Sequence, residues 1–143
     1  MFQRVSLLVI SALMMVAMLG GCATGAKGPT PEEQVQQAVA AWTAAAEAKD
    51  VDKMMTFVAE NFQSDEWADK ETYRAFVKDS VDMGYLDDLD ISTDKAKITF
   101  EGKDKATVYP VELTASFGSA TLKAVFTEED GKWLVTDVTM EQY

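Results

Sequence analysis

Residues 106–141, ATVYPVELTASFGSATLKAVFTEEDGKWLVTDVTME, alternate apolar and polar side chains and are interrupted by two groups of turn-forming residues. The first group is Gly118-Ser119 and the second is Glu129-Asp130-Gly131. An Asp-Gly pair between alternating runs is a strong hairpin signal, so this stretch predicts consecutive antiparallel strands. Two shorter alternating runs precede this stretch, near 89–91 and 96–101. The other predicted strands lie near 106–117, 120–128 and 133–141.

The residues before Gly84 have helical patterns instead. Thr30-Pro31-Glu32-Glu33 combines a capping Thr, a Pro at the first helical position and a Glu at the third, which predicts the start of a helix. Asp50 and Asp69 are capping residues for two further helices, the first over about 51–59 and the second ending near Gly84. Three helices followed by antiparallel strands predict an α+β domain in which a curved sheet covers the helices.

The first 21 residues predict an export signal. Arg4 precedes an apolar run over 7–19, which is shorter than the ~20 apolar residues that span a bilayer. The following Leu19-Gly20-Gly21-Cys22 resembles the lipobox of bacterial lipoproteins, which implies cleavage before Cys22 and its acylation, palmitate included. In that family Ala23 after the cysteine implies sorting to the outer membrane, facing the periplasm. We expect a signal peptide over 1–21, a lipidated cysteine and tether over 22–30, and one domain over 31–143.

The composition excludes several kinds of function. The 143 residues include no histidine and one cysteine, so imidazole catalysis, a disulfide within the chain and a thiolate zinc site are ruled out. With 13 basic and 24 acidic residues the formal charge is −11, which argues against nucleic acid as a partner. We predict no cofactor.

The order of several short motifs resembles the nuclear transport factor 2-like superfamily, which includes cystatin-like and SnoaL-like domains. The motifs are Ala41-Trp42, Asp50-Val51-Asp52, Phe57 with Asn61-Phe62, and the closing segment 129–135, EDGKWLV. The resemblance implies a cone of helices against a bent sheet with a cavity between them. It also implies either an enzyme, such as an isomerase or dehydratase, or a domain that only binds.

The last predicted strand supplies a candidate for chemistry in that cavity. By alternation Trp133, Val135 and Asp137 share one strand face, and the resemblance implies that this face points inward. Asp137 is then a candidate general acid or base with Tyr109 as a hydrogen-bond donor, because an apolar pocket raises the pKa of a carboxyl group. The alternative is a solvated carboxylate near the rim. The candidate pocket residues are Trp42, Phe76, Tyr109, Trp133 and Asp137.

Two polar stretches raise other possibilities. Trp67 lies in an acidic loop, so we expect it to be exposed and available for a protein interaction. The acidic run of Asp87, Asp88, Asp90 and Asp94 does not have the spacing of a calcium loop, since Thr93 stands where that loop needs Gly. We predict no metal site there, and a charged strand edge instead.

Three hypotheses for function follow. The first is a membrane-anchored lipoprotein whose domain is a non-catalytic module that binds a small apolar ligand or an envelope protein. The second is a small isomerase, dehydratase or hydrolase acting on a hydrophobic substrate through Asp137. The third is an envelope scaffold that forms a homodimer or docks to a partner through an apolar patch on the convex sheet face.

Overall fold

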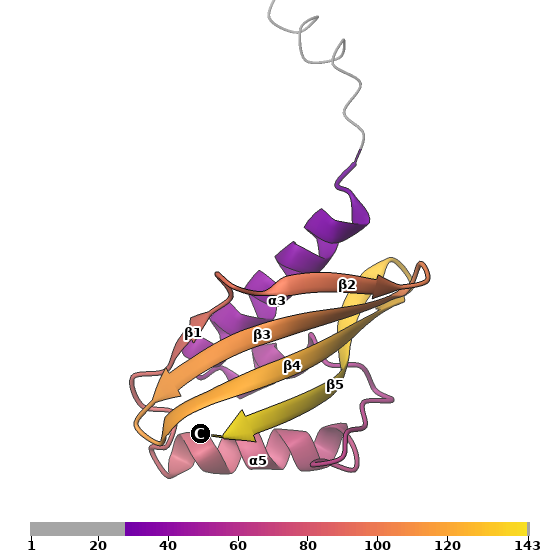
Figure 1. Cartoon of the computed structure of the whole chain (residues 1–143). Coiled ribbons are helices and arrows are strands. Elements are labelled where there is room, and N and C mark those ends of the chain that lie inside the picture. Colours follow the sequence, from indigo (N-terminus) through magenta and orange to yellow (C-terminus); the bar gives the residue numbers. More distant parts are fainter. Residues whose placement is uncertain (1–27, 143) are drawn as a thin grey trace, which may run out of the picture.

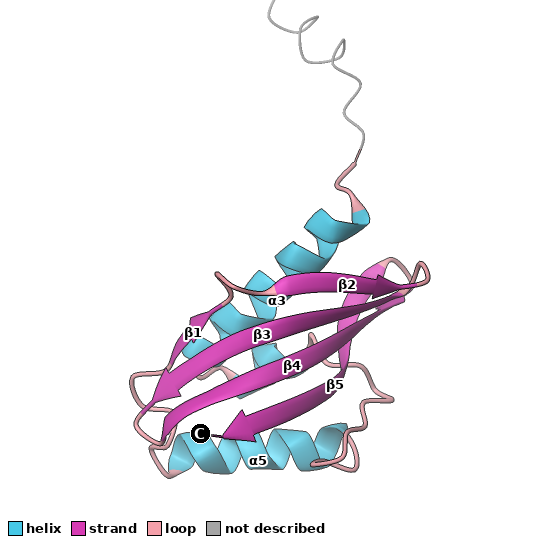
Figure 2. Cartoon of the chain, in the orientation of Figure 1, coloured by secondary structure: helices cyan, strands magenta, loops and turns pink. Residues whose placement is uncertain are grey.

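The computed structural model describes residues 28–142 and has the predicted α+β architecture (Figures 1 and 2). The predicted signal peptide and Cys22 lie outside the described residues. Within residues 28–142, no helix has the length and apolar character needed to cross a membrane. The helices are α3 (Pro31–Glu47), α4 (Val51–Met55) and α5 (Lys70–Asp82), and the strands are β1 (Asp90–Ser92), β2 (Lys97–Glu101), β3 (Lys105–Ala115), β4 (Gly118–Glu129) and β5 (Lys132–Gln142).

All three predicted helix starts are confirmed by their caps. Thr30 and Glu33 form a reciprocal capping box at α3, with N···O distances of 3.2 and 2.9 Å. Asp50 caps α4 through the Lys53 N–H at 3.1 Å. Asp69 caps α5 by accepting from the N–H and hydroxyl of Thr72, and these bonds hold the pKa of Asp69 below its ordinary value.

The helix ends follow the same local rules, with one difference in length. Gly84 has φ +77° and stops α5, as predicted, because its N–H and that of Tyr85 bond back into the last turn. Lys49 takes the equivalent left-handed position after α3, with φ 56°. The second helix ends at Met55, not near residue 59 as predicted, because the chain turns there and the Ala59 N–H bonds to β5.

The sheet is antiparallel, in the order β1-β3-β4-β5, with β2 also paired to β3. The predicted hairpin turns are confirmed: Gly118, Asp130 and Gly131 all have positive φ. Figure 1 shows the sheet curving around α3, with α5 along its β5 edge.

Two irregularities interrupt the sheet and contribute to its bend. In β3 the register shifts between Val108 and Val111, at Pro110, which has no N–H to donate to the ladder. In β5 the pairs Phe126↔Val135 and Val125↔Asp137 leave Thr136 as an extra residue. An extra residue on one strand of an antiparallel pair is a β-bulge, which bends the strand and increases its twist.

The core lies between α3 and the concave sheet face. Trp42 of α3 is 2% exposed and meets the edge of Phe126 on β4, with ring centroids 5.9 Å apart. Val35 on α3 and Val135 on β5 are fully buried in the same cluster. One apolar stripe of α3 therefore holds the helix against the centre of the sheet.

We predict that Phe126→Ala lowers the free energy of unfolding by about 3–5 kcal/mol, because the substitution leaves a cavity under Trp42. Urea denaturation followed by tryptophan fluorescence measures this. Thr114→Ala is the control, since Thr114 is exposed on β3 and its replacement should cost less than about 1 kcal/mol. Equal losses for the two variants would contradict this account of the core.

Candidate functional site

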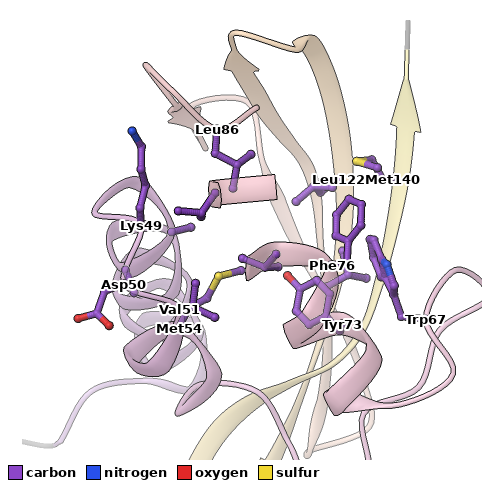
Figure 3. Close-up of a pocket in the computed structure, with 15 residues that line it drawn as sticks. Lys49, Asp50, Val51, Met54, Trp67, Tyr73, Phe76, Leu86, Leu122 and Met140 are labelled. Carbon is purple, nitrogen blue, oxygen red and sulfur yellow. The ribbon is translucent and has the colours of Figure 1, made fainter. Parts of the chain in front are cut away.

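An apolar cavity opens between the helices and the sheet (Figure 3). The C-terminal end of α3, together with α4 and α5, forms one side of it, and the start of β4 and the end of β5 form the other. Its wall on the helix side comes from Ala46, Met54 and Tyr73, and its wall on the sheet side from Leu122 and Met140. Trp67, Phe76 and Leu86 complete the mouth. The cavity exists because the last turn of α3 ends in alanines, which leave space beside α5.

The cavity is small, about 70 Å³. Pockets for free small molecules usually enclose about 300–1,000 Å³, and an apolar cavity that holds benzene has about 150 Å³. The concave side next to α5 is thus mostly filled by core side chains. The remaining space accepts one apolar group, such as a single side chain or the end of an acyl chain.

The charged residues at the cavity do not point into it. Figure 3 shows the ends of Lys49 and Asp50 directed away from the interior. Lys49 Nζ forms an ion pair with Asp87 Oδ1 at 3.3 Å, and the carboxylate of Asp50 caps α4. Both charged groups therefore stabilise the fold and are not available to a ligand in the cavity.

Tyr73 supplies the polar atom inside this apolar wall. The residue is 3% exposed and stacks on Phe62 at 4.8 Å, and its hydroxyl points toward Met54 across the cavity (Figure 3). Burial raises the pKa of the Tyr73 phenol well above its usual range, so it stays protonated. The site thus offers a neutral hydroxyl rather than a general base.

The expectation that Trp67 is exposed is wrong. It is 7% exposed, and its ring contacts Tyr73 and Phe76 with centroids 4.9 and 5.0 Å away. Its backbone N–H and carbonyl both bond to Ser64, so the loop folds back on itself. The polar neighbours that suggested exposure face solvent, while the indole forms part of the cavity wall.

The expectation that Asp137 faces the cavity is also wrong, and the β5 bulge is the reason. Because Thr136 is an extra residue, Val135 and Val138 pair with inward-facing residues of β4, whereas Asp137 pairs with Val125 on the outer face. One Asp137 carboxylate oxygen, Oδ1, is buried without a hydrogen bond from the described residues. Desolvation raises the pKa of this carboxyl group, and the nearby Lys123 opposes that effect.

Of the five predicted pocket residues, Phe76 lines the cavity and the other four do not. Trp42 is in the core, and Trp133 is buried against Phe100 with its indole N–H donating to Gln34 at 3.2 Å. The ring of Tyr109 is on the outer sheet face, where its hydroxyl donates to Glu141 at 3.4 Å. The sequence did not predict the lining residues Ala46, Leu122 and Met140. Small and aliphatic residues are equally common in a filled core, so their type does not indicate a cavity.

The outer sheet face is polar. Thr107, Thr121 and Thr127 alternate with the inward core residues of β3 and β4, and Tyr109 is the large aromatic among them. Among the described residues this face has one exposed large hydrophobic side chain, Tyr109, and not the apolar patch that the convex-face scaffold hypothesis requires. Among residues 28–142 no group of three or more acidic residues is arranged to hold a metal ion.

The arrangement of helices and bent sheet is shared with many solved structures. A protein of unknown function from Pseudomonas putida, described as NTF2-like, superposes with a TM-score of 0.65 at 13% identity, covering 81% of this chain and 90% of that one. A cystatin-like protein of unknown function from Nostoc punctiforme gives 0.61 at 18% identity, covering 80% and 94%. This chain has the nuclear transport factor 2-like fold. No protein-family model and no curated protein sequence matches it.

The nuclear transport factor 2-like fold also forms part of larger proteins. Bd1075 of Bdellovibrio bacteriovorus superposes with a TM-score of 0.65 at 12% identity over 76% of this chain, but this chain spans only 39% of Bd1075. At these identities the likeness concerns the fold alone, so function has to be argued from the site.

We predict that Asp137→Asn stabilises the protein at pH 7. Because the folded state raises the pKa of Asp137, it holds that proton more tightly than the unfolded chain, and stability falls as pH rises from about 4 through the folded-state pKa. Asn carries no charge at any pH, so the variant does not lose this folding stability as the pH rises. The measurement is the urea midpoint at pH 7 and at about pH 3, where the difference between variant and wild type should disappear.

The control for this prediction is Asp94→Asn, which removes an exposed carboxylate. If Asp94→Asn raises the pH 7 midpoint as much as Asp137→Asn does, the effect comes from net charge and not from the buried carboxyl group.

Proposed function

We propose that the protein is a lipid-anchored lipoprotein of the bacterial envelope whose domain is a non-catalytic binding module. The observation that carries the binding role is the cavity beside Tyr73, which is apolar, open at Phe76 and sized for one inserted group. A buried hydroxyl in its wall offers one hydrogen bond to whatever enters. Insertion of one side chain or chain end from a larger partner fits this space better than a free metabolite does.

A catalytic role has weaker support. General acid–base catalysis needs a titratable group that can reach the reacting atoms. The Asp137 carboxylate is on the opposite face of the sheet, and the Tyr73 phenol stays protonated. The charges of Lys49 and Asp50 are engaged at the rim.

The anchor is supported by the N-terminal sequence. The apolar run over 7–19 is followed by Gly20-Gly21-Cys22, and the eight residues 22–29 span at most about 28 Å when extended. More than one acyl chain on Cys22 would hold the protein stably, whereas a single chain binds marginally. The domain would then stay close to the membrane surface, with α3 as its nearest element.

The cavity can be tested with xenon as an apolar probe. In methyl NMR spectra we expect xenon to shift the Met54 and Met140 resonances, because these residues line the cavity. Ala46→Leu should abolish the shifts by filling the space. Ala44→Leu is the matched control, since Ala44 is exposed on the same helix. Shifts that persist in Ala46→Leu, or no shifts in the wild type, would overturn the cavity assignment.

The anchor can be tested in a Gram-negative host. The full chain is expected to incorporate a labelled palmitate analogue and to partition with membranes, and Cys22→Ser should lose both properties. Ser6→Ala, a change within the predicted signal peptide that keeps the cysteine, serves as the control. Labelling or membrane retention that survives Cys22→Ser would contradict lipidation at this residue.

A further inference from the structure

Three exposed apolar side chains gather at the end of the domain where α5 meets the β3–β4 hairpin. Met83 is 63% exposed, Tyr85 53% and Phe117 37%. Phe76, 42% exposed, lies seven residues before Met83 and therefore on the same side of α5. We call these four residues the distal patch. Within residues 28–142 one other large hydrophobic residue is exposed, Tyr109, and it lies on the outer sheet face, away from the distal patch.

The distal patch is held by hydrogen bonds between segments far apart in sequence. The hydroxyl of Ser116 donates to the carbonyl of Gly84 at 2.6 Å, and the Ser116 N–H donates to the Asp87 carbonyl at 3.0 Å. The Phe117 N–H reaches the Tyr85 carbonyl at 3.4 Å. Because these bonds order the backbone under Tyr85 and Phe117, the two rings are exposed on a rigid base, which lowers the entropic cost of binding.

The distal patch continues into the cavity and faces away from the N-terminus. Phe76 belongs to both, since it lines the cavity mouth beside Trp67. Figure 1 shows the end of α5 and the β3–β4 hairpin on the opposite side of the domain from the start of α3. A partner on this surface would therefore not compete with the attachment of the chain at its N-terminus.

The charge around the distal patch is negative. Residues 79–94 contain six aspartates and no basic residue, and the β3–β4 turn over 113–122 is uncharged. Asp82 and Asp87 are in ion pairs with Lys78 and Lys49, at 2.7 and 3.3 Å. Asp79 and Asp88 are exposed, and Asp79 lies four residues before Met83, on the same side of α5. This charge repels anionic lipid headgroups and attracts a cationic partner.

We propose that the distal patch binds a basic, amphipathic segment of another protein, whose apolar side chains cover Met83, Tyr85 and Phe117 and place one anchor in the cavity at Phe76. Exposed aromatic and methionine side chains beside a pocket are the composition of interface hot spots, and acidic residues around them select a basic partner. The assignment rests on the proposed binding role and names the chemistry of its partner.

The test uses the chain with Cys22→Ser, which removes the proposed lipidation site, and a fluorescent amphipathic helical peptide of lysine and leucine as the probe. Binding is followed by fluorescence anisotropy. We expect binding that is lost when the lysines are replaced by glutamate or the leucines by serine. The double variant Met83→Ser/Tyr85→Ser should weaken binding by about tenfold or more. Tyr109→Ser is the matched control and should leave it unchanged.

A second pair of variants separates local charge from net charge. Asp79→Asn/Asp88→Asn is expected to weaken peptide binding more than Asp104→Asn/Glu128→Gln, which removes the same charge at the other end of the sheet. Equal weakening by the two charge pairs, or by Met83→Ser/Tyr85→Ser and Tyr109→Ser, would overturn the proposal.

Other occupants give other results. Dimerisation in sedimentation experiments that Met83→Ser/Tyr85→Ser abolishes would assign the distal patch to a second copy of the chain, and patch-dependent binding to phosphatidylcholine vesicles would assign it to lipid. Either result overturns the peptide assignment. Xenon binding in the cavity is measured on the same variants. If xenon binds but the peptide does not, the peptide assignment fails alone; if neither binds, the proposed binding role fails as well.

Discussion

The backbone of Val135 connects the sheet to the segment between α4 and α5. Its N–H donates to the Phe57 carbonyl at 2.8 Å and its carbonyl accepts from the Ala59 N–H at 2.9 Å, so a short parallel bridge forms along the free edge of β5. One residue later, the bulged Thr136 accepts from the Gln63 N–H at 3.1 Å. These bonds cover a strand edge that would otherwise be open to pairing with other chains.

The chemistry available to the domain depends on this junction. With the loop tied to β5, Trp67 is pressed against Tyr73 and becomes a wall of the cavity. The same bulge turns Asp137 to the outer face, so the concave side keeps a neutral hydroxyl and no carboxylate from β5. A single extra residue in β5 thus separates Asp137, a partly desolvated acid, from the apolar cavity, which supports the proposed binding role.

The two ends of the domain also differ in surface composition. The start of α3, next to the proposed tether, is capped by Thr30 and Glu33 and is polar. The other end has the cavity mouth and the distal patch, surrounded by aspartates. In the proposed function the membrane attachment is at the first end and the recognition surface is at the other, so the protein would reach a partner away from its own membrane.

Local sequence signals determined most of the secondary structure and the fold class. Capping at Thr30, Asp50 and Asp69, the helix stop at Gly84 and the Asp-Gly hairpin turn depend on neighbouring residues, so they are visible in the sequence. The position of Asp137 and the burial of Trp67 were decided only by the tertiary structure. A bulge shifts strand alternation without a reliable local signal, and Trp67 is buried by Tyr73 and Phe76 and by a loop tied to β5, contacts that the polar residues around it do not reveal.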